Sequence, residues 1–192
     1  MRLLITLLIL PLFMTAQNTS ELPYYEIPEA PESYNAGTVA ARMVDGLGFR
    51  YYHATDGLTK KDLEFKPSEK GRTAFQTIEH IYNLSEMIVN TALQKATDFT
   101  TEPEELSFED MRKQTLLNFK KASDALKEFE NLDKNKLTFI TGGGTRDYPF
   151  WNAINGPISD ALWHCGQVVS FRRSSGNPFN SKASVLSGTV RD

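Results

Sequence analysis

Cysteine and histidine are scarce in this sequence of 192 residues, which contains one cysteine, Cys165, and three histidines. With a single cysteine the chain cannot form an internal disulfide, so its apolar core, with or without a bound ion, has to stabilise the fold. Basic residues do not outnumber acidic ones, and the formal net charge is −3. This balance gives no support for nucleic-acid binding, and we expect no nucleic-acid partner.

A long hydrophobic run is found only at the start of the chain, in residues 1–16, MRLLITLLILPLFMTA. The run has one Arg near its start, is too short to span a bilayer comfortably, and ends in small residues. These features are typical of a secretory signal peptide. A retained membrane anchor is the weaker alternative, because Pro11 interrupts the run and no basic stop-transfer cluster follows it. We therefore expect an exported protein, periplasmic or extracellular, with no stable membrane span after processing.

The remaining composition is that of a folded protein, with 40% hydrophobic and 23% charged residues. Residues 17–32, QNTSELPYYEIPEAPE, contain three prolines and no helical period, which predicts an extended lead-in. We expect residues 33–192 to form one domain.

Four stretches of this domain repeat their apolar residues at helical spacing, and they predict helices over residues 33–56, 74–95, 107–132 and 151–174. SFED at Ser107 resembles a capping box, with Asp110 in place of the usual Glu. Pro157 predicts a kink in the fourth helix or a later start, and Gly176 is expected to end it. The whole pattern predicts an all-α fold, a four-helix bundle with an extended lead-in and a C-terminal tail over the bundle.

Three consecutive glycines interrupt the segment LTFITGGGTRDYPF, residues 137–150, whose first half favours a β-strand. The glycines lack the spaced Gly-Lys-Ser/Thr pattern of a phosphate-binding loop. We therefore expect a mobile hinge ahead of the fourth helix.

Asp160 and His164 are four residues apart in the predicted fourth helix, so their Cβ atoms lie on one face, ~6 Å apart. Two side chains hold a divalent ion poorly, and a third ligand has to come from a neighbouring helix. His80 is the better candidate, because it lies mid-helix among apolar residues where an unpaired imidazole is costly to bury. His53 is the reserve. The alternative is that these are ordinary surface histidines and a solvated Asp160–His164 pair.

Cys165 follows His164 directly, but adjacent helical residues point ~100° apart, which makes a catalytic dyad geometrically poor. We expect the thiol to be packed inside. Arg172 and Arg173 could bind an anion, although cations at the end of a helix also complement its dipole, and we favour this second interpretation.

The segment IEHIYNLSEM around His80, together with DALWHCGQVVSFRRSSGNP around His164, resembles the DinB-like metal-binding four-helix-bundle superfamily. Members carry one His on the second helix and a His-x-x-x-His pair on the fourth, commonly followed by Gly-Gln. The segments RYYHATDGLTKKDLEFKP and YPFWNAINGP are also similar, so the resemblance covers residues 34–178. Carried over to this sequence, the ligand positions fall on His80, Asp160 and His164, and Asp160 departs from the usual His.

The resemblance implies a divalent metal cofactor such as zinc, nickel, manganese or iron, and Asp160 does not select among these ions. Characterised members of the superfamily include thiol-dependent transferases and isomerases. An ion with open coordination positions could lower the pKa of a bound thiol or water. Since an exported protein works away from the cytosolic thiol pool, metal-assisted hydrolysis of a small molecule is an alternative.

Three hypotheses follow from these residues. The first is a metal-dependent enzyme of the cell envelope that acts on a small-molecule substrate or thiol, with Gln167, one turn beyond His164, contacting a ligand or the substrate. The second is a noncatalytic metal- or ligand-binding bundle. The third is a family member that has lost the metal. Exposed aromatic residues could also support a homodimer.

Overall fold

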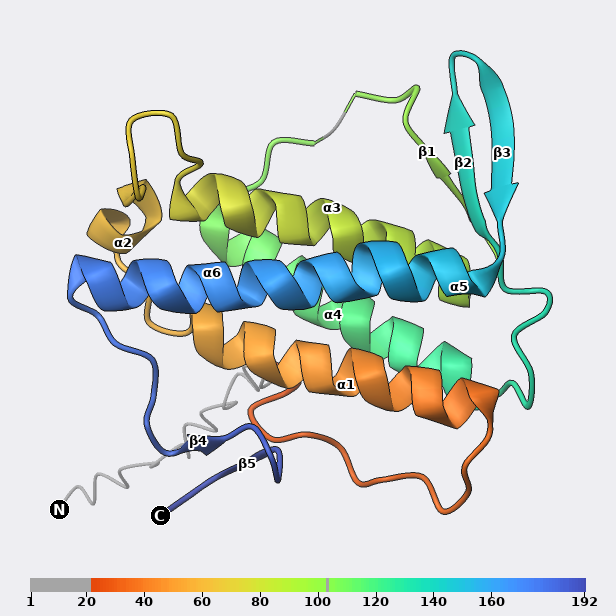
Figure 1. Cartoon of the computed structure of the whole chain (residues 1–192), viewed down its shortest axis with the longest axis horizontal. Helices are drawn as coiled ribbons and strands as arrows, with labels where there is room; N and C mark the ends of the chain where they lie inside the picture. The colour runs from red at the N-terminus through yellow and green to blue at the C-terminus, as the bar shows by residue number, and fades with distance from the viewer. Residues whose placement is uncertain (1–21, 103) are drawn as a thin grey trace, which may run out of the picture.

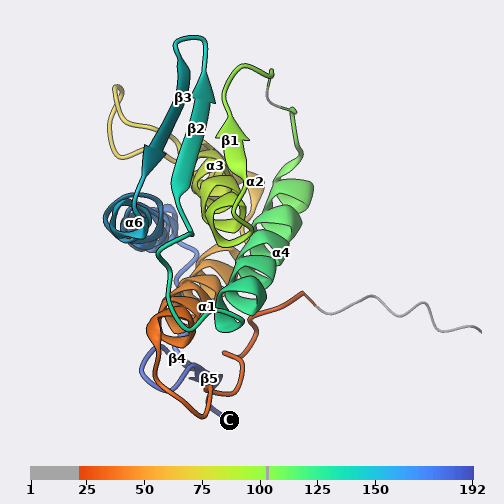
Figure 2. The same cartoon turned by 90° about the vertical axis from the view of Figure 1, so that its right-hand side faces the viewer.

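Four long helices form the body of the protein, with bounds Ala36–Thr55 (α1), Ala74–Ala92 (α3), Phe108–Lys127 (α4) and Ser159–Ser175 (α6). The computed structural model describes residues 22–102 and 104–192, and the protein is mostly helical (Figure 1). Seen nearly end-on, the helices surround one core in the order α6, α3, α4, α1 (Figure 2). The four helices predicted from the apolar spacing are thus confirmed, with ends that differ by a few residues.

Side-chain caps explain where three of these helices begin. At the start of α3, the Thr73 hydroxyl accepts from the backbone N–H of Gln76 at 3.1 Å, and the Gln76 amide oxygen accepts from the backbone N–H of Thr73 at 2.9 Å. Asn35 and Thr38 form the same reciprocal box before α1. Ser107 caps α4 through the backbone N–H of Asp110. These caps satisfy N–H groups that have no partner inside the helix.

The core between the helices is apolar and receives side chains from all four of them. Fully buried examples are Val44, Leu47 and Tyr51 of α1, Ile78 and Ile81 of α3, Leu116 and Phe119 of α4, and Ala161 and Val168 of α6. Burial of this surface is the main favourable contribution to folding. In the described part of the chain, no helix combines the length and the apolar character needed to cross a membrane.

A small three-stranded sheet lies beyond one end of the helices, so the expectation of an all-α fold is wrong in this region. Its strands are β1 (Ala96–Asp98), β2 (Leu137–Thr141) and β3 (Gly144–Tyr148). β1 pairs with β2 in parallel, and β2 pairs with β3 as a hairpin (Figure 1). The glycines expected to form a hinge make the hairpin turn, where Gly144 has a φ of +104° that favours glycine.

α6 is the last part of a longer helical segment that changes geometry before the candidate site. The segment begins with α5 (Phe150–Ala153) and passes through a π-helical turn, η1 (Ile154–Ile158), that contains Pro157. Within this turn Gly156 leaves helical dihedral angles (φ −90°, ψ −105°). The kink expected from Pro157 is therefore confirmed, and Gly176 ends α6 with a φ of +101°.

The extended segments at the two ends of the chain pack on the helices and on each other. The expected signal peptide, residues 1–16, lies outside the described residues. In the lead-in, the ring of Tyr24 lies against α1 at Gly48, where any Cβ would come within 2.6 Å of the ring. The tail forms β4 (Ala183–Ser184) and β5 (Thr189–Val190), and the backbone N–H of Ile27 donates to Gly188. The tail thus covers the lead-in, as an extended segment over the bundle.

A short helix, α2 (Lys60–Glu64), lies in the connection between α1 and α3, outside the four predicted helices. The side chain of Asp62 in α2 is buried and accepts hydrogen bonds from Ser175 and Asn177 at the end of α6. This contact ties the connection to α6, close to the loop that borders the candidate site.

Candidate metal centre

Three side chains that can ligate a metal meet where α3 passes beside α6. His80 comes from the second turn of α3, and Asp160 and His164 come from the first turns of α6. One ligand atom from each lies within 4.8 Å of the other two. Among residues 22–102 and 104–192, this is the one group of three or more such side chains. The structure thus brings together the three residues selected in the sequence.

The position of the group follows from the two faces of α6. Its buried positions are spaced by four and three residues: Ala161, Cys165, Val168, Arg172 and Ser175. The neighbouring stripe is half-buried and consists of Asp160, His164, Gln167 and Phe171. Helical periodicity puts this stripe at the edge between the core and the solvent.

The distances from Asp160 to the two histidines match those between ligands of one ion. His80 Nε2 lies 3.1 Å from Asp160 Oδ2, and His164 Nε2 lies 3.3 Å from Asp160 Oδ1. Atoms bound ~2.1 Å from one ion, at angles between tetrahedral and octahedral values, are separated by ~3.0–3.4 Å. The two rings stand nearly perpendicular, at 88° with centroids 4.7 Å apart. Little movement would be needed to coordinate an ion, although the same distances also fit hydrogen bonds.

The polarity of the contacts around His164 favours a cation between the side chains. His164 Nδ1 lies 2.8 Å from the amide oxygen of Gln167, which can only accept a hydrogen bond. Nδ1 therefore carries the proton, and a neutral His164 presents a lone pair at Nε2. That lone pair faces the carboxylate of Asp160, which is also an acceptor. Two acceptors at this distance require a proton or a metal ion between them.

The group is open on one side. The side chains of His80 and Asp160 are 32% and 37% exposed, while that of His164 is 14% exposed. Above them lies a cavity of about 580 Å³, lined by Pro67, Arg72, Thr77, His80, Asp160, His164, Gln167 and Phe171. Its size is within the range of small-molecule sites. An ion held by the three side chains would keep coordination positions that face this cavity.

His53 does not belong to the group, so it cannot serve as the reserve ligand. Its side chain is buried near the end of α1, with Nε2 2.9 Å from the carbonyl oxygen of Tyr25. The rings of Phe49, Tyr52 and Phe179 surround it. Burial lowers the pKa of His53, because the charged form loses its solvation. None of these contacts joins His53 to His80, Asp160 or His164, so it does not support the ligand group indirectly either.

Cys165 points into the core, and the expectation of a packed thiol is confirmed. It is 3% exposed, and burial raises its pKa to about 12. A thiol with so little thiolate is a poor nucleophile and a poor metal ligand near neutral pH. The arrangement therefore excludes a Cys165–His164 dyad.

Arg172 and Arg173 differ in their surroundings, and Arg172 has a structural role that the sequence did not indicate. Its buried guanidinium donates to the carbonyl oxygens of His53 and Ala54 at the end of α1, and to Asn177. The cation thus complements the C-terminus of α1 rather than that of its own helix. Arg173 is exposed.

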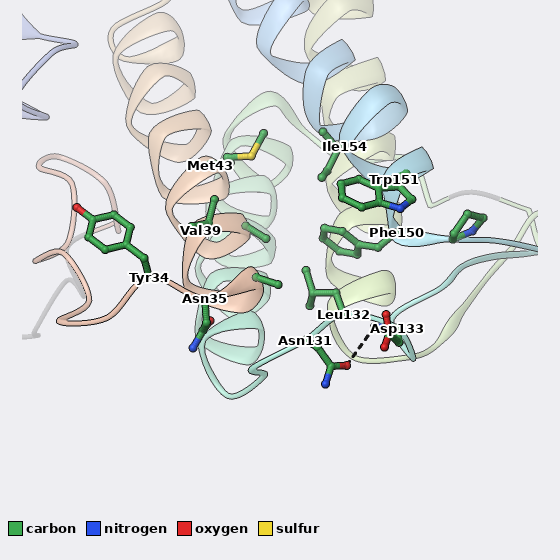
Figure 3. Close-up of a pocket in the computed structure, with 13 residues that line it drawn as sticks. Tyr34, Asn35, Val39, Met43, Asn131, Leu132, Asp133, Phe150, Trp151 and Ile154 are labelled. Atoms are coloured by element: carbon green, nitrogen blue, oxygen red, sulfur yellow. Dashed lines mark hydrogen bonds between the residues drawn. The ribbon is translucent and has the colours of Figure 1, made fainter.

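A second cavity, of about 500 Å³, lies between the start of α1 and α5 (Figure 3). Figure 3 shows Val39 and Met43 on one side and Phe150, Trp151 and Ile154 on the other. The lining is mostly apolar, and none of the three ligand side chains belongs to it. This cavity is therefore separate from the metal-ligand group.

Comparisons with protein-family models, with curated proteins and with solved structures gave no match. The resemblance to the DinB-like superfamily therefore stays a prediction, and the case for a metal centre depends on the geometry of the three side chains.

The sequence did not reveal the residues that complete the cavity. Pro67 and Arg72 come from the loop before α3, and Thr77 and Phe171 come from the helices. No short motif links these four positions to the ligand group. Phe171 lies seven residues after His164, which puts the two side chains on one face of the helix, two turns apart. Only this spacing could have indicated that Phe171 lines the cavity.

Proposed function

We propose that this protein holds a divalent metal ion through His80, Asp160 and His164 and uses it to act on a small molecule. In this proposal the helices form a four-helix bundle of the DinB-like type, in an exported protein of the cell envelope. The observation that carries the proposal is the convergence of three ligand atoms within 4.8 Å beneath a cavity of about 580 Å³.

The donor set fits a catalytic ion better than a purely structural one. Structural zinc sites are closed by four protein ligands, whereas catalytic sites commonly use three and leave a position open. Two imidazoles and one carboxylate are also found at metal sites that bind substrate or oxygen. The exposure of His80 and Asp160 provides access from the cavity.

The residues of the chain would have distinct tasks in this chemistry. When bound, the ion would act as a Lewis acid and lower the pKa of a thiol or water coordinated to it. Gln167 accepts from Nδ1 of His164 and thereby directs the Nε2 lone pair into the group. Pro67 and Phe171 provide apolar wall for the substrate and keep water away from it.

The direct test is elemental analysis of the full-length protein purified without a histidine tag. We expect close to one equivalent of a transition metal in the wild type and loss of most of it in His164→Ala. Ser170→Ala, an exposed change on the same helix, is the matched control and should retain the ion. A wild-type protein without metal after incubation with zinc, nickel, manganese and iron would refute the proposal.

A noncatalytic metal-binding bundle is the second candidate, favoured by the fact that the ligands come from two neighbouring helices. An ion bridging α3 and α6 would stabilise the fold without any reaction. The two candidates differ in the open position. In the cobalt-loaded protein, azide or a thiol should change the visible absorption if the position is accessible. An unchanged spectrum would favour the structural role.

A further inference from the structure

Arg72 is the one cationic side chain lining the cavity above the ligand group. It immediately precedes Thr73, the N-cap of α3, and is exposed. Within residues 22–102 and 104–192, no acidic side chain lies within ion-pair distance of Arg72. Glu79 lines an adjoining hollow with Arg72, but the two form no ion pair. The guanidinium is thus available to a ligand in the cavity.

The helix that follows Arg72 adds to the positive potential. α3 has 19 residues, and its first turn contains no acidic residue to complement the positive end of the helix dipole. A cation at this end is unfavourable, because it repels the partial positive charge of the terminal N–H groups. The carboxylate of Asp160 also lines the cavity, but its oxygens face His80 and His164 at 3.1 Å and 3.3 Å, and Arg72 is not among their contacts. An anion bound at Arg72 would relieve the repulsion between this cation and the start of α3.

We propose that the cavity binds a small carboxylate ligand, with the carboxylate on Arg72 and a second donor atom at the open position of the ion. This inference rests on the proposed metal site and specifies the substrate class. The planar guanidinium fork pairs with a carboxylate through two parallel hydrogen bonds. Pro67 and Phe171 would contact the short apolar stem between the two polar ends.

Two isosteric thiols test this assignment in the full-length, cobalt-loaded protein. The probes are 3-mercaptopropionate and 3-mercaptopropanamide, which differ only in the charge of the end remote from sulfur. Binding is followed by the sulfur-to-cobalt charge-transfer band. We expect the wild type to bind the carboxylate about ten-fold more tightly than the amide, as is typical of a charge-assisted pair at a partly exposed site. The preference should shrink as the salt concentration rises.

Variants of Arg72 identify the side chain responsible. In Arg72→Gln the two thiols should bind within a factor of about two of each other, with unchanged cobalt content. Arg72→Lys keeps the charge without the fork and should retain part of the preference. Arg173→Gln removes an exposed arginine that does not line the cavity, and it should behave as the wild type.

The possible outcomes separate this inference from the proposed metal site. Equal affinities in the wild type, or a preference that survives in Arg72→Gln, would show that Arg72 is a solvated surface residue and overturn the inference while leaving the ion in place. Failure of the wild type to take up cobalt would overturn the metal site and the inference together. The cobalt absorption before addition of thiol distinguishes these cases.

Discussion

Gln167 contacts the nitrogen of His164 that does not face the Asp160 carboxylate, with 2.8 Å between its amide oxygen and Nδ1. We expect Gln167→Ala to weaken metal binding about 10- to 100-fold, because partners that orient metal-ligating histidines have effects of this size. Gln167→Glu keeps an acceptor at this position and should retain most of the affinity. Competition with a chromophoric chelator measures the difference. Equal affinity in Gln167→Ala would mean that packing alone orients the ring.

The ligand group was accessible from the sequence because a helix makes the positions of Asp160 and His164 predictable, and because there were only two other histidines to consider. His80 required a guess about which helices are neighbours, guided by its apolar surroundings and the family resemblance. Arg72 and Pro67 could not be found in this way. Their place at the cavity depends on the path of a loop, which no periodicity encodes.

At the scale of elements, Arg172 joins α6 to the end of α1. Its guanidinium donates at 2.8 Å and 3.1 Å to the carbonyl oxygens of His53 and Ala54. We expect Arg172→Met to lower the free energy of unfolding by about 3 kcal/mol, because buried carbonyl groups would lose charged donors. Urea denaturation measures the loss.

The exposed neighbour Arg173 provides the control for this experiment. Arg173→Met should change the stability by less than ~0.5 kcal/mol. A similar loss in both variants would indicate that charge at the end of α6, rather than the contact with α1, is responsible.

The stability that the contact between α2 and α6 contributes should depend on pH, because the contact is made by the carboxyl group of Asp62. Burial by itself raises the pKa of this carboxyl, but hydrogen bonds from Ser175, Asn177 and Thr59 outweigh it and hold the pKa well below its usual range. The unfolded chain therefore takes up the proton first as the pH falls. The stabilisation is complete above the unfolded pKa of ~3.9 and is lost as the pH falls through the folded value.

We expect Asp62→Asn to be less stable than the wild type at neutral pH, with a weaker dependence of stability on pH below ~4. The difference in slope should approach, and not exceed, ~1.4 kcal/mol per pH unit, which corresponds to one proton. Denaturation curves at a series of pH values give both slopes. Asp133→Asn, at an exposed carboxylate, is the control. Identical slopes in wild type and Asp62→Asn would assign the acid sensitivity to other groups.

The elements differ in how far the sequence predicted them. The long helices carry their own signals, namely apolar spacing, Asn35, Thr73 and Ser107 as caps, and Gly176 as a terminator. The β-strands do not, because β1 and β2 are stabilised by pairing between segments about forty residues apart. The run of glycines is compatible with a hinge or a tight turn, and only the pairing of the flanking strands makes it a hairpin.

The π-helical turn before α6 is a further feature that the sequence showed only in part. Pro157 predicted a disturbance there, but not its geometry. At this kink Gly156 leaves helical dihedral angles, so α6 follows a different axis from α5. The direction of α6 after the kink determines how Asp160 and His164 meet His80 of α3. Local propensity does not determine that direction, because it is set by the packing of α6 against the core.

At the scale of the whole molecule, α3 and α6 are neighbours around the core although a long stretch of chain separates them (Figure 2). An ion held by both helices would bind the folded state and not the unfolded chain, so it should stabilise the entire cooperative unit. At a free metal concentration 100 times the dissociation constant, this stabilisation is about 2.7 kcal/mol. For a domain of this size, it corresponds to a rise in Tm of roughly 5–10 °C.

We therefore expect the Tm of the metal-stripped protein to rise with added zinc or manganese and to continue rising with concentration. The chelator EDTA should reverse the rise. In His164→Ala the rise should be absent over the same range, because two of the three ligands remain and hold the ion poorly. An equal rise in the wild type and in His164→Ala would place the ion elsewhere on the protein, and the bridge between α3 and α6 would then have no part in its stability.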